Sequence, residues 1–318
     1  ANPDDAPDSL TNNGTIVSDY AGMRGGMGDT LVNNGSIKAN IFGIECSVYD
    51  LSSRCVVINH GTITTNSAWA DGVYIFSPTT LHNTVINTGL ISGAVYLYPG
   101  DDTASGHDSV FNSGTIDGQY VRLGGGQNTL VNAGTSLHSA VINAGVYGGL
   151  GDELIVNGPF AYVGGIDGGD GHDSILNSST VAGAIIGGTG NDTINAGPGD
   201  DFVYAGLGRD RVHGEDGADT LGGGGGSDTL VGAVGNDSLI GGGGHDRIFA
   251  GTGADYASGG AGNDIINATH QDTIAQGPGG ARVTTIQDPG AVLRLVLINA
   301  DTNQPILSLR DGQTLDLA

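Results

Sequence analysis

Between residues 187 and 267 the chain repeats a nine-residue pattern of polar and apolar positions nine times, as in GGTGNDTIN and GGGGSDTLV. The first six positions are small or polar and predict a turn, and the last three predict a short strand with an apolar centre. Since such a strand cannot stand alone, we expect two repeats to form one eighteen-residue coil and the coils to stack as a parallel β-solenoid. The apolar residues at the eighth position are Ile194, Val203, Val212, Leu221, Leu230, Leu239, Ile248, Ala257 and Ile266.

The fourth position of every repeat is Gly and the sixth is Asp. Glycine tolerates positive φ angles, so the backbone carbonyls of such a turn can point inward, and the Asp adds a hard anionic oxygen. Oxygen ligands on a tight turn suit Ca²⁺ better than Zn²⁺ or copper. The pattern therefore predicts several bound Ca²⁺ ions, with the carboxylates of Asp192, Asp201, Asp210, Asp219, Asp228, Asp237, Asp246, Asp255 and Asp264 as ligands.

In this spacing the repeats fit GGxGxDxUx, where U is a large apolar residue, and residues 187–267 resemble the repeats-in-toxin (RTX) calcium-binding family. The resemblance implies a β-roll in which Ca²⁺ lies between successive turns, held by the repeated Asp and by loop carbonyls. A flexible glycine-rich linker is the alternative, but a linker has no reason to keep an apolar residue two places after each Asp. Because stacked aspartates repel one another and the apolar core is thin, we expect the roll to fold only with Ca²⁺.

The first half of the chain carries a looser repeat of the form (D/N)-(S/T)-(L/V/I)-x-N-x-G-(T/S)-(I/V), as in DTLVNNGSI and DSVFNSGTI. The Asn-x-Gly step is typical of a turn between two strands, and stacked Asn side chains can form a hydrogen-bonded ladder. The spacing predicts solenoid coils of 20–28 residues, with Asn143 as an extra copy. The repeated asparagines are Asn12, Asn33, Asn59, Asn87, Asn112, Asn132, Asn157 and Asn177.

Residues 168–176, GGDGHDSIL, form a complete nonapeptide that overlaps the looser pattern, so Asp173 joins the predicted calcium ligands. This overlap favours one continuous all-β parallel solenoid, with irregular coils over residues 1–186 and the strict β-roll over 187–276. Two similar segments, GGMGD at 25–29 and GGLGD at 148–152, lack one residue of the repeat. We interpret them as simple turns, with weak calcium binding as the alternative.

The tail, residues 277–318, departs from the repeat. VLRLVLIN at 292–299 and PILSLRD at 305–311 predict two strands joined around residues 301–304, and QTLDLA predicts a third. Three roles remain open for this tail: a cap on the end of the solenoid, the C-terminal secretion signal that RTX proteins carry for type I secretion, and a strand that pairs with a neighbouring subunit.

The 34 acidic and 10 basic side chains give a net charge of -24, which disfavours nucleic acid and anionic membrane surfaces as partners. No segment is long and apolar enough to predict a transmembrane helix. Cys46 and Cys55 lie in a predicted loop, and we expect a disulfide if the protein is extracellular, two buried thiols being the alternative. The histidines that precede turn aspartates, His107, His172 and His245, are interpreted as facing solvent.

Five tyrosines follow short small-residue steps and predict an aromatic ladder on one face: Tyr74, Tyr96, Tyr120, Tyr147 and Tyr162. Packing within the stack is the favoured interpretation. An outward-facing ladder that binds sugars or a neighbouring rod is the other one.

The chain contains no HExxH, GxSxG or phosphate-loop motif, and an enzyme is not expected. Two hypotheses follow. The first is a secreted, calcium-binding structural protein that folds on Ca²⁺ and self-assembles into an extracellular surface layer, filament or matrix. The second is a monomeric calcium-dependent adhesin that binds a cell-surface polysaccharide. A carbohydrate-active β-helix is a weaker option, and an ice-binding face is disfavoured because the nonapeptides lack a regular Thr array.

Overall fold

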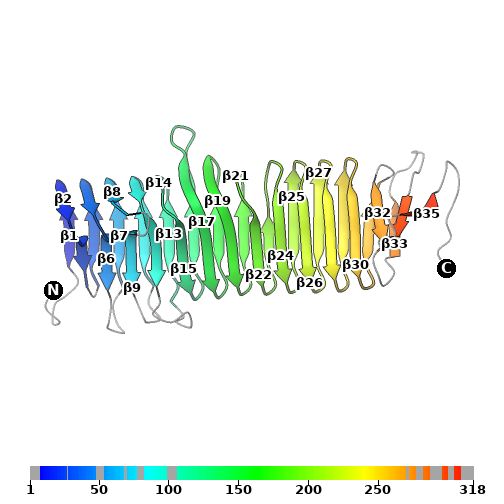
Figure 1. Ribbon diagram of the computed structural model, residues 1–318, viewed down its shortest axis with the longest axis horizontal. Coiled ribbons are helices and arrows are strands. Elements are labelled where there is room, and N and C mark those ends of the chain that lie inside the picture. The colour runs from blue at the N-terminus through cyan, green and yellow to red at the C-terminus, as the bar shows by residue number, and fades with distance from the viewer. Residues whose placement is uncertain are drawn as a thin grey trace. The chain divides into compact units, whose positions relative to one another are not determined.

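The computed structural model describes residues 8–26, 28–47, 54–67, 70–76, 82–98, 106–269, 272–276, 282–286, 296–299 and 304–308. Within these ranges the chain forms β-strands and no helix, and therefore no helix that could cross a membrane. It divides into two compact units, Ala1–Gly183 and Ala184–Ala318. In each unit the strands lie side by side (Figure 1), and almost every pair is parallel, as an all-β parallel solenoid requires.

In the N-terminal unit most coils contain three strands, so that β4, β5 and β6 form one coil and β7, β8 and β9 the next. The second and third strands merge in the long strand β17, which pairs with both β14 and β15. The strands are β1 Ser9–Asn12, β2 Thr15–Ser18, β3 Ala21–Gly25, β4 Thr30–Asn33, β5 Ser36–Ala39, β6 Phe42–Ser47, β7 Val56–Asn59, β8 Thr62–Thr65, β9 Asp71–Phe76, β10 Thr84–Asn87, β11 Leu90–Ser92, β12 Ala94–Tyr98, β13 Ser109–Asn112, β14 Thr115–Ile116, β15 Tyr120–Gly125, β16 Thr129–Asn132, β17 Ala140–Leu150, β18 Leu154–Asn157, β19 Ala161–Asp170, β20 Ser174–Asn177 and β21 Thr180–Val181.

The predicted asparagine ladder is confirmed and sets the register of this unit. Each buried Asn donates its Nδ2–H to the Oδ1 of the Asn in the next coil, at 2.8–2.9 Å, from Asn12 through to Asn177. The neighbouring corner is tight, since a Cβ on Gly35 would lie less than 3 Å from the carbonyl oxygen of Gly14. The prediction for Asn143 is wrong. It is exposed and donates to Asp117 instead, because it lies within β17 and not at a corner.

In the C-terminal unit the eighteen-residue coil is confirmed, because each residue pairs with the one eighteen places on, as Leu221 does with Leu239. The predicted six-residue turn is wrong. The seven strands β24 to β30 have six residues each, since positions one to three of these repeats pair with the next coil and leave a three-residue turn. The strands are β22 Ile185–Thr189, β23 Thr193–Asn195, β24 Phe202–Leu207, β25 Arg211–Asp216, β26 Thr220–Gly225, β27 Thr229–Val234, β28 Ser238–Gly243, β29 Arg247–Thr252, β30 Tyr256–Ala261, β31 Ile265–Ala268, β32 Thr273–Gln276, β33 Arg282–Ile286, β34 Val296–Asn299 and β35 Gln304–Ser308.

The two strands predicted in the tail are present as β34 and β35, which pair in antiparallel orientation. Parallel pairing continues beyond residue 276, because β33 pairs with β31 and β34 with β32. The predicted third strand, QTLDLA, lies outside the described residues.

The core of each unit consists of columns of aliphatic side chains, in which each buried side chain stacks on its register partner in the next coil. All nine eighth-position residues of the repeats are at most 2% exposed, and Leu31, Val57 and Val85 occupy the matching column of the N-terminal unit with no exposed surface. Each buried aliphatic side chain contributes roughly 1.5–3 kcal/mol. Because each column is only one side chain wide, contacts within the turns between the strands must also stabilise the fold.

Candidate metal centre

The predicted calcium ligands of the repeats form two ladders in the C-terminal unit, because successive repeats place their Asp residues alternately on the two turns of a coil. The backbone N–H of each Asp donates to the Oδ1 of the Asp one coil further on, at 2.8–3.0 Å. The first ladder contains Asp192, Asp210, Asp228, Asp246 and Asp264. The second contains Asp201, Asp219, Asp237 and Asp255.

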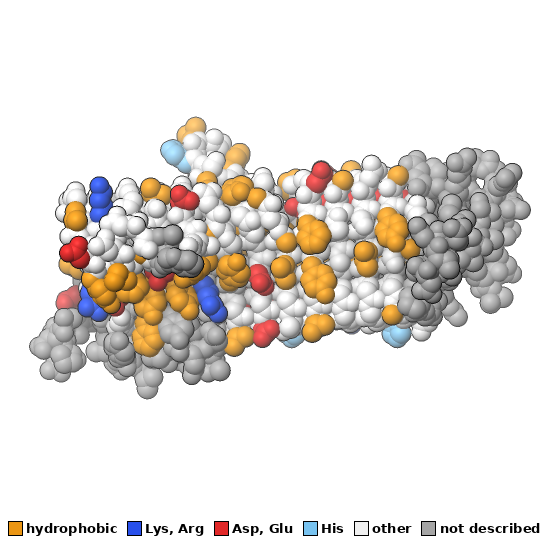
Figure 2. Space-filling view, in the orientation of Figure 1, with side chains coloured by type: hydrophobic (Ala, Val, Ile, Leu, Met, Phe, Trp, Pro, Cys, Tyr) orange, Lys and Arg blue, Asp and Glu red, His pale blue; other side chains and the backbone are white. Residues whose placement is uncertain are grey.

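Only one oxygen of each carboxylate is used in this way. The Oδ2 atoms of eight of these residues are buried without a hydrogen-bond partner: Asp201, Asp210, Asp219, Asp228, Asp237, Asp246, Asp255 and Asp264. A buried, uncompensated carboxylate oxygen is costly, and native proteins seldom leave so many. Few carboxylates appear on the described part of the face drawn in Figure 2, although the sequence has 34 acidic residues.

Several of the ladder carboxylate oxygens lie in small cradles beside a glycine at position one of the repeat, whereas Ala196, Ala205 and Ala250 place a methyl group at that position. A Cβ added to Gly223 would lie 2.5 Å from the Oδ2 of Asp228 and 2.5 Å from the carbonyl oxygen of Gly241, one coil on. The same arrangement, with both oxygens less than 3 Å from the added Cβ, recurs at Gly187, Gly214, Gly232 and Gly241. Each cradle thus brings a carboxylate oxygen toward a carbonyl oxygen of the neighbouring coil.

Burial and the neighbouring carboxylates destabilise the ionised aspartates. Burial, followed by repulsion from Asp219 and Asp200, raises the pKa of Asp201 to about 7. Burial is also the largest cause at the other positions, where it raises the pKa of Asp219 and Asp237 and raises the pKa to about 6 at Asp210, Asp228, Asp246 and Asp255. A bound cation would remove this penalty, because it neutralises the charge and gives the oxygen a partner.

These oxygens fit Ca²⁺. The donor set is hard, anionic and carbonyl oxygen without nitrogen or sulfur, as Ca²⁺ prefers. The ladder aspartates would hold the ions together with carbonyl oxygens such as that of Gly241. Bound calcium would supply charge neutralisation and cross-links between coils. Within the described ranges, no three His, Cys, Asp or Glu side chains converge on one point.

Asp173, the tenth predicted ligand, belongs to the N-terminal unit. It is 2% exposed, and its Oδ1 accepts the N–H of Glu153 at 2.8 Å. Asp272 is a ladder member that the sequence analysis missed. It accepts the N–H of Asp255 at Oδ1, while its Oδ2 accepts from Thr269, so both oxygens are satisfied. The Asp-Thr-Ile at 272–274 repeats the sixth to eighth positions, but its spacing of 17 residues breaks the period.

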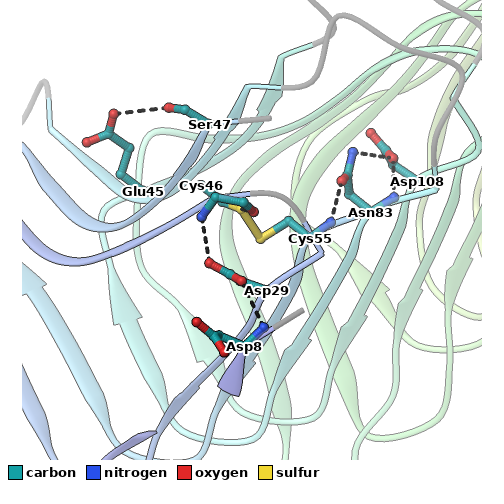
Figure 3. Close-up of a disulfide and its surroundings, with 9 residues drawn as sticks. Asp8, Asp29, Glu45, Cys46, Ser47, Cys55, Asn83 and Asp108 are labelled. Carbon is teal, nitrogen blue, oxygen red and sulfur yellow. Dashed lines mark hydrogen bonds between the residues drawn. A yellow bond between two sulfur atoms is a disulfide. The ribbon is translucent and has the colours of Figure 1, made fainter. Parts of the chain in front are cut away.

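The N-terminal unit has a ladder of its own at the equivalent position, made of other residues. Cys55 donates its N–H to the Oδ1 of Asn83, and Asn83 donates to Asp108, in successive coils (Figure 3). The predicted Cys46–Cys55 disulfide is present, although Cys46 lies in strand β6 and not in a loop. Disulfide and amide groups therefore replace several of the carboxylates that would need a cation.

The two segments interpreted as shortened turns differ. Asp29 is a simple turn residue, as predicted, because its Oδ2 accepts the N–H of Gly26 and its Oδ1 that of Asp8. The prediction that 148–152 lacks a residue is wrong. Residues 148–156 form a full repeat in which Glu153, and not Asp152, occupies the sixth position, as its N–H bond to Asp173 demonstrates.

Two residues adopt a backbone conformation that the repeat reserves for glycine. Position two has positive φ in Gly206, Gly224 and Gly242, and in two repeats it is occupied by Glu215 (φ 80°) and Ala233 (φ 79°). Positive φ is unfavourable for residues with a Cβ.

The histidines His107, His172 and His245 are exposed, as predicted.

A second candidate site is an open hollow of about 570 Å³ on the N-terminal unit, lined by Tyr96, Gln119, Tyr120, Arg122, Tyr147 and Asp167 among others. The aromatic ladder is only partly as predicted. Ring contacts connect Tyr74, Tyr96 and Tyr120 at 5.7–5.8 Å.

In the parallel pairing of β12, β15 and β17, Tyr96 pairs with Arg122 and Arg122 with Tyr147, so an arginine lies between these two tyrosines. Tyr162 pairs with Val141 and Thr180 and is not part of this column. The rings of Tyr74, Tyr96 and Tyr120 contact one another along the stack, in agreement with the favoured interpretation of packing within it. Tyr147, in contrast, is 47% exposed.

Three comparisons with known proteins bear on these sites. Residues 186–221, 222–257 and 240–269 match the family described as RTX calcium-binding nonapeptide repeat (4 copies). Among solved structures, the chain is similar to a hyperactive, Ca²⁺-dependent, beta-helical antifreeze protein from an Antarctic bacterium, with 16% identity, a TM-score of 0.46, and coverage of 91% of this chain and 86% of that one. No curated protein matches the sequence.

Proposed function

We propose that this chain, whose residues 186–269 are RTX calcium-binding nonapeptide repeats, is a secreted structural protein that folds on Ca²⁺ and self-assembles outside the cell. The observation that carries the proposal is the set of buried, unpartnered Oδ2 atoms along the two aspartate ladders. At low calcium these carboxylates would repel one another, and at the roughly millimolar calcium of extracellular fluids they would bind ions and order the coils. The Cys46–Cys55 disulfide supports an oxidising compartment.

The support for self-assembly is apolar surface on the outer face of the C-terminal unit. Phe202, Tyr204 and Leu207 on β24 are 55%, 48% and 61% exposed, and Ile240 on β28, two coils from Tyr204 in register, is 46% exposed. Exposed hydrophobic side chains that cluster in this way mark association surfaces. Calcium binding would also reduce the net charge of -24 that keeps copies of the chain apart.

Size-exclusion chromatography with light scattering, in roughly millimolar Ca²⁺ and again in EGTA, tests the proposal. We expect large assemblies in Ca²⁺ that dissociate in EGTA. The double variant Phe202→Ser, Tyr204→Ser should remain monomeric in Ca²⁺ with an unchanged circular dichroism spectrum, whereas Phe160→Ser, an exposed apolar position of the N-terminal unit, should still assemble. A wild-type chain that stays monomeric at high concentration in Ca²⁺ would refute self-assembly and leave calcium-dependent folding standing.

The tyrosine hollow supports a second candidate function, calcium-dependent binding of a polysaccharide. Tyr96, Tyr120 and Tyr147 supply aromatic surface on which sugar rings can stack, while Arg122 and Asp167 supply a charged donor and acceptor beside it. A glycan array provides the test. Hits that disappear in Tyr96→Ala and Tyr147→Ala but persist in Tyr256→Ala, an exposed tyrosine elsewhere, would favour this function. An array without hits would count against it.

A further inference from the structure

Residues 148–156 repeat the geometry of the calcium cradles outside the segment that matches the RTX family. A Cβ added to Gly148 would lie 2.9 Å from the Oε2 of Glu153 and also less than 3 Å from the carbonyl oxygen of Gly168 in the next coil. The pairing of Gly149 with Gly169 and the hydrogen bond from Gly151 N to Asp170 O align this repeat with the one that contains Asp173. Position one, the sixth-position acid and the carbonyl of the next coil thus take the same places as in the C-terminal unit.

The Glu153 carboxylate is buried, with 2% of its surface exposed, and only one of its oxygens is satisfied. Its Oε1 accepts from the Nδ2 of Asn128 at 3.1 Å, whereas its Oε2 has no hydrogen-bond partner. The carboxylate of Asp173 lies on the same turn, one coil on. Burial and, next, the charge of Asp173 raise the pKa of Glu153 to about 9. The neighbouring carboxylates of Glu153 and Asp173, with the Glu153 Oε2 lacking a hydrogen-bond partner, require either a bound cation or a proton shared between them.

The preceding coil indicates which oxygens surround that place. There the sixth position is Asn128, whose Nδ2 donates to the carbonyl oxygens of Gly124 and Gly126 at 3.2 and 3.3 Å and to Glu153 Oε1 at 3.1 Å. A positively polarised amide group therefore sits among two turn carbonyls and the acid of the next coil. In the Glu153 coil no amide is available to fill this position, and the corresponding acid of the next coil is Asp173.

We propose that Glu153 and Asp173, together with carbonyl oxygens of the 148–151 turn and of Gly168, form a calcium site in the N-terminal unit. The site does not depend on the proposed self-assembly. At the ladder position the coils before it hold together through the amides of Asn128 and Asn83, the Cys55 disulfide, and the carboxylate of Asp108, whose Oδ1 accepts both the N–H and the Nδ2–H of Asn83. Glu153 then marks the coil at which bound calcium replaces these contacts as the link between successive coils.

The test uses the full-length protein and Ca²⁺ alone. Native mass spectrometry should count one ion fewer in Glu153→Gln than in the wild type, since glutamine keeps the Oε1 acceptor and supplies an amide like that of Asn128. Asp152→Asn is the matched control. Asp152 is the exposed neighbour whose Oδ1 accepts the N–H of His172 at 2.8 Å, and its variant should bind the wild-type number of ions.

A crystal structure of the wild type grown in Ca²⁺ gives an independent measurement, should Glu153→Gln fail to fold. Anomalous density beside Glu153 and Asp173 would support the site. Equal ion counts in wild type and Glu153→Gln, or a map with ions along the RTX ladders and none here, would overturn it and assign a shared proton to the pair. Absence of ions from the ladders as well would instead refute the calcium function proposed for the repeats.

Discussion

Replacement of Asp228 by Asn isolates the electrostatic cost of one ladder carboxylate. The Oδ1 of Asp228 accepts the N–H of Asp210 at 2.9 Å, and an amide oxygen can make the same bond. Asn83 and Asn128 already do so in the N-terminal unit. The substitution therefore keeps the hydrogen bond of the ladder and removes one negative charge, together with one proposed calcium ligand.

The magnitude follows from the raised pKa of Asp228. Burial, with a further contribution from the charge of Asp210, raises it from 3.8 to about 6. This shift corresponds to about 3 kcal/mol of destabilisation of the folded, metal-free chain at neutral pH. We expect Asp228→Asn to recover up to that amount in EGTA. In calcium the variant should need a higher Ca²⁺ concentration to fold, because an anionic ligand is lost.

The raised pKa of Asp228 also determines the direction in which stability changes with pH. An acid whose pKa is higher in the folded state binds protons more tightly when folded, so Asp228 does not destabilise the metal-free chain below about pH 4 and destabilises it increasingly as the pH rises toward about 6. Asp228→Asn lacks this term. The difference between the two proteins should be absent at pH 4, grow between pH 4 and 6, and remain constant above.

Far-UV circular dichroism during thermal unfolding in metal-free buffer, from pH 4 to 8, measures both effects. The control is Asp216→Asn, which removes a charge from an exposed position of the same unit and should change little. Equal stability of wild type and Asp228→Asn at pH 7.5 in EGTA, or a difference that persists unchanged at pH 4, would refute the electrostatic argument.

Two further substitutions test the backbone and the asparagine ladder. Ala233→Gly should stabilise the C-terminal unit by roughly 0.5–1 kcal/mol in thermal unfolding, because φ is 79° at this position, whereas Ala218→Gly, at an exposed position without positive φ, should not. Asn33→Ala should cost about 2–4 kcal/mol in denaturant unfolding, since it removes the 2.8 Å acceptor of the Asn12 Nδ2–H and the donor to the buried Asn59 Oδ1. Asn34→Ala, at the exposed neighbour, should cost well under 1 kcal/mol, and equal losses in the two variants would contradict the role of the ladder.

The regular part of the fold could be predicted from the sequence because its period equals half a coil. Once the period is nine residues, every Asp and every eighth-position residue stacks on its equivalent two repeats away, whatever the details of the turns. The Asn ladder was predictable for a similar reason, although its coils vary in length, because six of its eight asparagines are followed two residues later by a Gly that favours a turn.

The tertiary structure alone decided features that depend on register between coils of unequal length. It extended the strands into the glycines at positions one to three, placed Glu153 in a ladder position, and put Cys55 in line with Asn83. It also placed Arg122 between Tyr96 and Tyr147. In a solenoid the neighbours of a residue come from the coils above and below, so where the period breaks, sequence spacing no longer indicates which side chains meet.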